Sequence, residues 1–181
     1  GGAGVPYQDF VVVLEEVARA GLSSLCTGLS VHSDIVAPYV AHLGNDAQRD
    51  YWLPKLVSGE AIGAIGMTEP GAGSDLANIR TTAVRDGDSY VINGSKTFIS
   101  NGQHAGLVIL AAKTDPTAGS KGVSLFLVDT SLPGFARGKN LEKIGLHSQD
   151  TSELFFDNLR VPASALLGEE GKGFAYMMPE L

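Results

Sequence analysis

Met67-Thr68-Glu69-Pro70-Gly71-Ala72-Gly73-Ser74-Asp75 is the most informative stretch of this sequence. Two glycines flank one small residue, a hydroxyl lies on each side, and Pro70 fixes the entry. Glycine lets the backbone approach a ligand closely because it has no Cβ, and successive N–H groups in such a turn suit phosphate oxygens. The local pattern fits an anion-binding turn and, equally well, a plain Pro-Gly turn followed by a capping Asp75.

The stretch matches neither common nucleotide-binding motif. Leu76 stands where GxGxxG has its third glycine, and no Gly-Lys-Ser/Thr follows for a P-loop. The motifs that follow in the sequence are more specific than this stretch alone. Further motifs follow at characteristic spacing: Asn93–Gly102 with an Asn-Gly pair at each end, Lys143-Ile144-Gly145 with Ser148, Phe156-Asp157 with Val161-Pro162, and the glycine-rich Gly168–Gly173 before Phe174.

In that order, and over essentially the whole chain, these motifs resemble the acyl-CoA dehydrogenase family of flavoenzymes. The ending Met177-Met178-Pro179-Glu180-Leu181 looks most like the long-chain branch. Members of the family begin with further helix and end with a large helical domain. The resemblance therefore implies that this sequence is a piece of a larger enzyme.

Composition limits the classes of function. The 181 residues are 44% hydrophobic, enough for a real core, and the net charge of −7 with scattered basic residues argues against nucleic acid and anionic membranes as partners. No run of about 18 apolar residues predicts a membrane span, and no targeting signal is visible. Cys26 is the single cysteine, so no intrachain disulfide is expected. The resemblance implies bacterial cytoplasm or, in a eukaryote, the mitochondrial matrix.

The first part of the chain has the period of helices. Apolar residues recur at three- and four-residue steps from residue 7, Gly21 ends the first helix, and a second covers Ser23–His42 with a bend at Pro38. Asn45 and Gln48 predict a capping box. Pro54 predicts that the helix which follows is kinked or short.

From about residue 60 the period becomes strand-like. Asp86-Gly87-Asp88 and Asn93-Gly94 are expected to be hairpin connections. Since no helices alternate with the strands, the pattern predicts an α+β fold in which N-terminal helices pack on an antiparallel β-barrel or sandwich, followed by the start of a C-terminal helix. The strand candidates are Ala61–Thr68, Thr81–Arg85, Ser89–Ile92, Ser95–Ser100, Gly106–Lys113, Val123–Asp129 and Glu153–Phe156.

These patterns suggest three parts. Residues 1–59 belong to an N-terminal helical domain, residues 60–163 form a middle β-domain, and residues 164–181 are a linker and the start of a C-terminal helical domain.

The resemblance implies FAD-dependent oxidation of an acyl-CoA thioester to its trans-2-enoyl form, with a glutamate as base and FAD as hydride acceptor. Ile65, Met67 and Thr68 correspond to positions along the flavin, where N–H groups and the Thr68 hydroxyl meet the pyrimidine edge. Gly73 and Ser74 correspond to the pyrophosphate positions.

Phe98, Ile99 and Ser100 correspond to the family's Trp-Ile-Thr, whose ring covers the flavin and whose hydroxyl approaches N5. Phenylalanine and serine keep the chemistry of the commoner residues with less packing area. By strand position alone, Phe98 would instead fill a barrel core.

On the substrate side, Ser74 corresponds to a residue near the thioester and Ser120 to one that contacts the pantetheine–phosphate portion. Ser120 fits a plain solvated loop serine equally well. Gly28 and Val31 align with a hydroxyl and a carboxylate of the medium-chain type, so smaller residues here imply a longer acyl channel.

No catalytic residue is expected within this chain. In the long-chain and isovaleryl branches the base lies about one helical turn beyond Leu181, so Glu180 is a tempting candidate in the wrong register. His32, His42, His104 and His147 lack metal spacing, and no metal site is predicted.

The resemblance further implies an electron-transfer flavoprotein as electron acceptor and a homo-oligomer. Two alternatives stay open: another enzyme of the same fold, such as an acyl-CoA oxidase or flavin-dependent hydroxylase, or a non-catalytic binding or scaffold protein.

Overall fold

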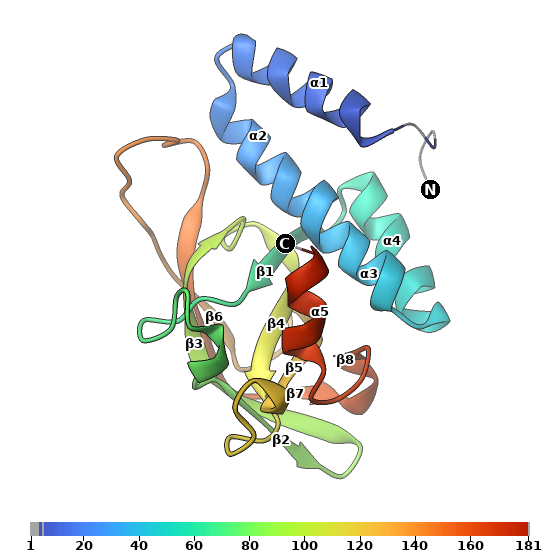
Figure 1. Cartoon of the computed structure of the whole chain (residues 1–181). Coiled ribbons are helices and arrows are strands. Elements are labelled where there is room, and N and C mark those ends of the chain that lie inside the picture. Colours follow the sequence, from blue (N-terminus) through green and yellow to red (C-terminus); the bar gives the residue numbers. More distant parts are fainter. Residues whose placement is uncertain (1–3, 5, 181) are drawn as a thin grey trace.

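Helices cover one side of a β-sheet in the computed structural model, which describes residue 4 and residues 6–180 (Figure 1). The α+β class is confirmed. No helix in the described part of the chain is long and apolar enough to cross a membrane. The helices are α1 (Tyr7–Arg19), α2 (Ser23–Ser30), the π-helical η1 (Val31–Val36), α3 (Ala37–Leu43), α4 (Asp46–Ser58) and α5 (Gly173–Glu180), with short 3₁₀ turns η2 (Leu76–Asn78), η3 (Gly119–Gly122) and η4 (Ala163–Ala165).

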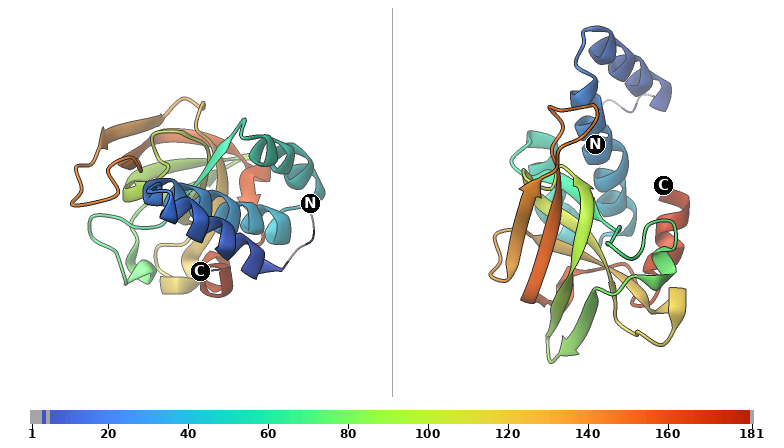
Figure 2. Two further views of the ribbon diagram at one scale, coloured as in Figure 1. Left: turned by 90° about the horizontal axis from the view of Figure 1, so that it is seen from above. Right: turned by 90° about the vertical axis from the view of Figure 1, so that its left-hand side faces the viewer.

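The helices α2, η1 and α3 form one continuous rod above the sheet, and α1 lies farther out with no buried residue (Figure 2). The sequence predicts a bend at Pro38, and the structure has a π-helical stretch that ends at Val36, two residues before this proline. Proline has no N–H to continue the α-helical ladder, and a wider π turn accommodates that interruption.

The helix α4 begins and ends as its sequence predicts, but Pro54 does not shorten it. Asn45 and Gln48 form the capping box, and the helix continues to Ser58 before Gly59 at φ 76°. Pro54 deprives the Asp50 carbonyl of its helical partner. Both residues are exposed, so water can satisfy that carbonyl.

The sheet is mixed and open, which corrects the expectation of an antiparallel barrel or sandwich. Its order is β6-β7-β3-β2-β4-β5-β8, with β1 paired to β4. Most pairs are antiparallel, but β1 runs parallel to β4. The chain reverses twice between β2 and β4, so β1, β2 and β4 point the same way. The strands are β1 (Ile62–Gly66), β2 (Thr82–Asp86), β3 (Ser89–Ser100), β4 (Ala105–Lys113), β5 (Val123–Asp129), β6 (Phe135–Asn140), β7 (Thr151–Pro162) and β8 (Leu166–Leu167).

One of the two expected hairpins is present. Asp86 pairs with Ser89 around Gly87, as predicted, whereas β3 passes through Asn93-Gly94 without a turn. Gly94 has φ 150°, the register shifts there, and a Cβ would lie 2.5 Å from the Thr81 hydroxyl. The Asn-Gly pair is therefore a bulge required by a close approach. The strand β6 was not predicted, because Phe135–Asn140 has no apolar alternation.

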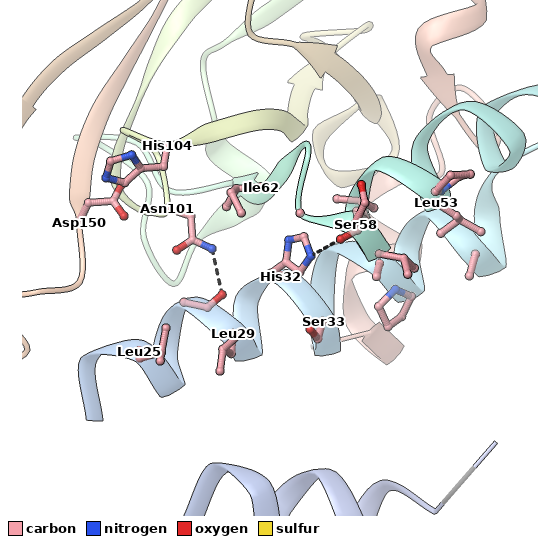
Figure 3. A pocket seen from close by; sticks show the side chains of 18 of the residues that line it. Leu25, Leu29, His32, Ser33, Leu53, Ser58, Ile62, Asn101, His104 and Asp150 are labelled. Atoms are coloured by element: carbon pink, nitrogen blue, oxygen red, sulfur yellow. Dashed lines mark hydrogen bonds between the residues drawn. The ribbon is translucent and has the colours of Figure 1, made fainter. Parts of the chain in front are cut away.

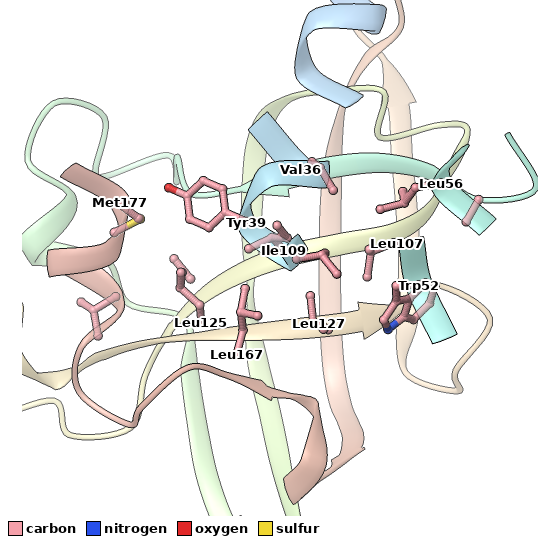
Figure 4. Packing of buried hydrophobic residues seen from close by; sticks show 14 of the residues in the cluster. Val36, Tyr39, Trp52, Leu56, Leu107, Ile109, Leu125, Leu127, Leu167 and Met177 are labelled. Atoms are coloured by element: carbon pink, nitrogen blue, oxygen red, sulfur yellow. The ribbon is translucent and has the colours of Figure 1, made fainter. Parts of the chain in front are cut away.

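Two hydrophobic clusters lie on the two faces of β4 and β5. Leu107, Ile109, Leu125 and Leu127 face the helices, where they pack with Val36, Tyr39, Trp52, Leu56 and Met177 (Figure 4). The alternate residues of the same strands pack against β3 and β7. Because side chains alternate along a strand, both faces of these central strands are buried. They form the rigid base for the segments that follow β1 and end β3.

Candidate functional site

The segment Met67–Asp75, called the glycine loop below, forms an exposed loop that leads from β1 toward β2. Glu69 and Ala72 exchange main-chain hydrogen bonds of 2.9 and 3.1 Å, which closes a tight turn around Pro70-Gly71. Ala72 and Ile79 are buried in the helix-side cluster and anchor the loop. A Cβ on Gly71 or Gly73 would meet nothing within 4 Å, so the outer face of the loop is open.

A buried ion pair closes the base of this loop. Lys96 Nζ donates to Glu69 Oε1 at 2.8 Å, and their side chains are 0% and 6% exposed. The Glu69 carboxylate also accepts from the N–H groups of Arg80 at 2.6 Å and Thr81 at 3.0 Å. One carboxylate thus joins the beginning of the loop to its end and to β3.

Both partners of this pair have shifted pKa values. Burial alone would raise the pKa of Glu69, but the charge and hydrogen bond of Lys96, together with hydrogen bonds from Thr81 and Arg80, hold that pKa below its usual range. Burial lowers the pKa of Lys96 to about 8, against the opposing effect of Glu69. At neutral pH the pair is therefore an ion pair enclosed by protein.

The end of β3 presents an aromatic ring to solvent. Phe98 is 67% exposed and has φ 59°, a left-handed conformation that is rare for a bulky residue. The pairing of β3 with β7 shifts register between Lys96 and Ile99, so Phe98 lies in a bulge. This excludes the interpretation of Phe98 as a core-filling residue. Strained backbone of this kind is concentrated at functional sites.

The other site residues expected from the sequence differ in what they can offer. Ile99 is buried in the cluster between β3 and β7, so it has only its main chain to offer a ligand, whereas Ile65 packs on the helix-side cluster and is partly exposed. Met67, Thr68 and Ser100 are partly exposed, and Ser74 is exposed. Ser120 lies in η3, which contacts η2 at the end of the glycine loop, so the structure brings it near the Ser74 segment.

This edge offers hydroxyl groups and an open main chain to a ligand. The hydroxyls of Thr68, Ser74 and Ser100 make no hydrogen bond to another described residue, so all three are free to bind a ligand. The open faces of Gly71 and Gly73 leave room for phosphate oxygens. Phe98 supplies an aromatic face, so the residues present fit FAD.

A cluster of buried amides beside this edge was not predicted. Asn101 Nδ2 donates to the carbonyl oxygens of Gly28 and Gly63, each at 3.0 Å, and Gln149 Nε2 donates to Asn101 Oδ1 at 2.9 Å. A Cβ on Gly28 would lie 2.7 Å from Gln149 Oε1. This close approach gives the glycine a structural reason besides the longer acyl channel. The Asn101-Gly102 pair was the available signal, but it predicts only a turn.

A hollow of about 1760 Å³ lies along α2, α3 and α4. Figure 3 shows His104 and Asp150 at one end of it, Leu53 at the other and His32 between them. Within residue 4 and residues 6–180, no three His, Cys, Asp or Glu side chains gather as metal ligands. The hollow includes none of Met67–Asp75, but Asn101 and Gln149 of the buried amide cluster line it.

Two family models match the chain. The model described as "Acyl-CoA dehydrogenase, N-terminal domain" matches residues 1–60, and "Acyl-CoA dehydrogenase, middle domain" matches residues 64–159. This chain belongs to the acyl-CoA dehydrogenase family.

Two individual acyl-CoA dehydrogenases are similar to this chain over part of their own length. The mitochondrial long-chain specific acyl-CoA dehydrogenase of Sus scrofa is 51% identical over 185 residues, covering 100% of this chain and 42% of that protein. The crystal structure of acyl-CoA dehydrogenase from Geobacillus kaustophilus is 57% identical with a TM-score of 0.95, over 99% of this chain and 47% of that one. This chain thus spans less than half the length of either relative.

A third relative bears on the cofactor. A glutaryl-CoA dehydrogenase from Mycobacterium smegmatis, solved in complex with FADH2, is 40% identical with a TM-score of 0.77, over 84% of this chain and 39% of that one. The side chain of Glu180 and the whole of Leu181 lie outside the described residues, so the sequence argument about the base stays a prediction.

Proposed function

We propose that this acyl-CoA dehydrogenase chain supplies the FAD- and thioester-binding part of an enzyme that oxidises an acyl-CoA to its trans-2-enoyl form. The observation that carries the proposal is Phe98, a 67% exposed aromatic ring on a backbone at φ 59°. Residues held in such sparsely populated backbone conformations cluster at active sites and ligand-binding sites, so this exposed ring is a candidate contact for the flavin.

Each residue of the edge has a distinct role in this proposal. The main chain and hydroxyl of Thr68, with the main chain of Ile65 and Met67, bind the pyrimidine edge of the flavin. Gly73 and Ser74 bind the pyrophosphate, and Phe98, Ile99 and Ser100 line the flavin ring. When bound, FAD supplies the electron acceptor that no protein side chain can provide.

The substrate is an acyl-CoA thioester. In this proposal Ser74 lies near the thioester and Ser120 contacts the pantetheine–phosphate portion. The contact of η3 with η2, which follows the glycine loop, supports a shared site for the two serines. The acyl chain length stays undefined, because Gly28 is explained by its contact with Gln149 as well as by a longer channel.

The catalytic base is a carboxylate beyond residue 181, and the electron acceptor is an electron-transfer flavoprotein. We further propose three parts with boundaries near residues 59 and 163, assembly of the complete protein into a homo-oligomer, and a location in bacterial cytoplasm or the mitochondrial matrix.

The test compares residues 1–181 with the protein expressed from the complete reading frame, using acyl-CoA and an artificial electron acceptor. General-base assistance contributes about 10²–10⁴-fold to such reactions, so residues 1–181 should show no turnover without the base. They should also bind FAD weakly, because in this proposal the complete homo-oligomer supplies the rest of the flavin site. The complete protein should be active. Oxygen consumption without an added acceptor would indicate an oxidase or hydroxylase. An inert complete protein that retains FAD would indicate a scaffold.

A further inference from the structure

The buried pair Lys96–Glu69 reaches the main chain that the flavin would contact. Besides its bond to Glu69, Lys96 Nζ donates to the carbonyl oxygen of Met67 at 3.0 Å. Lys96 is completely buried, so this ammonium group has no access to solvent. A buried charge is costly unless it is paired and hydrogen-bonded. A buried lysine cannot contribute to the solubility of the protein surface, so the Lys96 ammonium group must have another role.

The lysine determines which way one peptide unit faces. In a planar trans peptide, the C=O and the following N–H point to opposite sides. Because Met67 C=O is directed at Lys96, the N–H of Thr68 points away from the lysine. That N–H donates to no other described residue, whereas the next N–H, of Glu69, is used by Ala72.

The opposite side of the same segment is fixed as well. The N–H of Thr97 donates to the carbonyl oxygen of Thr68 at 2.9 Å. Residues 67 and 68 are thus held by two consecutive residues of β3, and Glu69 holds the far end of the loop through Arg80 and Thr81. Of the Thr68 and Glu69 N–H groups, that of Thr68 is the one to which the described residues offer no acceptor.

We propose that Lys96 and Glu69 are positioning residues that keep the Thr68 N–H oriented for the cofactor, an inference that rests on the proposed function. The pair contacts neither substrate nor cofactor. It acts through the Met67–Thr68 peptide, so that binding the flavin requires no reorganisation of the loop. Preorganised donors bind more tightly because the cost of ordering them is met during folding.

The decisive variant is the double substitution K96M with E69Q in the protein expressed from its complete reading frame. It removes both charges together, which avoids leaving one buried charge unpaired. The amide introduced by E69Q can still accept from Thr81. The matched control is R160M with D86N, which removes a surface ion pair whose side chains are 57% and 59% exposed.

Three measurements follow: melting temperature without FAD, the FAD dissociation constant, and the visible spectrum and reduction potential of the bound flavin. Losing the fixed orientation of the Thr68 N–H predicts about tenfold to a hundredfold weaker FAD binding in the double variant, with a shifted spectrum and potential. The control should match the wild type. A folded double variant with wild-type affinity, spectrum and potential would overturn the inference and leave the proposed function intact.

A variant-free measurement covers the case in which the double variant does not fold. In the wild type, hydrogen exchange at the Thr68 amide should be fast without FAD and at least tenfold slower with it, while the Thr97 amide is protected in both states. Unchanged exchange at Thr68 on FAD binding would contradict the inference. A folded wild type that binds no FAD would remove the proposed function, and the inference with it.

Discussion

The main-chain N–H of Thr97 donates to the carbonyl oxygen of Thr68 across 2.9 Å, joining the glycine loop to β3 immediately before the exposed ring of Phe98. Two stretches about thirty residues apart in sequence thereby become one edge. The bond places an aromatic face, a free hydroxyl and an open glycine turn on a rigid sheet, which is the arrangement that the proposed flavin site requires.

Phe98 should contribute to FAD binding and not to the stability of the fold. At φ 59° a residue with a Cβ is strained, so F98G should have a free energy of unfolding about 1 kcal/mol higher than F98A. Urea unfolding without FAD measures this difference. Both variants should bind FAD more weakly than the wild type. If F98A is instead the more stable of the two, residue 98 does not have the left-handed backbone conformation.

Glu69 should make the protein sensitive to acid. Its folded-state pKa is below the unfolded value of 4.5, so as the pH falls below 4.5 the unfolded state takes up more protons and the free energy of unfolding decreases. E69Q removes this contribution and should flatten the acid limb of the stability curve. It should also cost about 3–5 kcal/mol at neutral pH, because it leaves Lys96 buried without its charge partner.

Urea titrations at a series of pH values measure both effects. E60Q, which changes an exposed member of a surface pair, is the matched control. An E69Q variant with the wild-type acid limb would show that Glu69 is not the group responsible.

His32 should hold the helical layer on the sheet. Its Nδ1 accepts from the Gly63 N–H at 3.0 Å and its Nε2 lies 3.0 Å from the Leu56 carbonyl oxygen, so one ring joins α4 to β1. H32A should lower the free energy of unfolding by about 1–3 kcal/mol. H104A, at an exposed histidine of the same hollow, should change it by less than about 0.5 kcal/mol. Equal effects of the two substitutions would contradict this role.

Ser100 should affect the reaction more than the fold. It is partly exposed, and its hydroxyl has no partner in the described chain. S100A in the complete protein should leave the melting temperature unchanged and slow the bleaching of flavin absorbance by acyl-CoA. S95A, on the same strand, is the control and should keep the wild-type rate. Unchanged bleaching in S100A would show that a different residue has this role.

Structural features that depend on residues close together in the sequence could be predicted from it. The capping box at Asn45, the Asp86–Asp88 hairpin and the Pro70-Gly71 turn all depend on neighbouring residues, and each is present. The parallel pairing of β1 with β4 was missed because it depends on how many reversals lie between them, and one expected reversal, at Asn93-Gly94, is a bulge.

The candidate site shows the same division. The residues of the glycine loop could be named from their motif, but the Lys96–Glu69 pair spans 27 residues and has no spacing rule that would reveal it. The exposure of Phe98 depends on a bulge, and strand alternation alone predicts the opposite face. The cofactor roles of Ile65, Gly73 and Ser74, the substrate role of Ser120, and the position of the base stay predictions.

Anaerobic mixing of the complete, FAD-loaded protein with an acyl-CoA measures the proposed oxidation in a single turnover. We expect the visible flavin absorbance to bleach and one trans-2-enoyl-CoA to form for each flavin reduced. A protein that retains FAD and binds acyl-CoA without bleaching or enoyl product would contradict the proposed function.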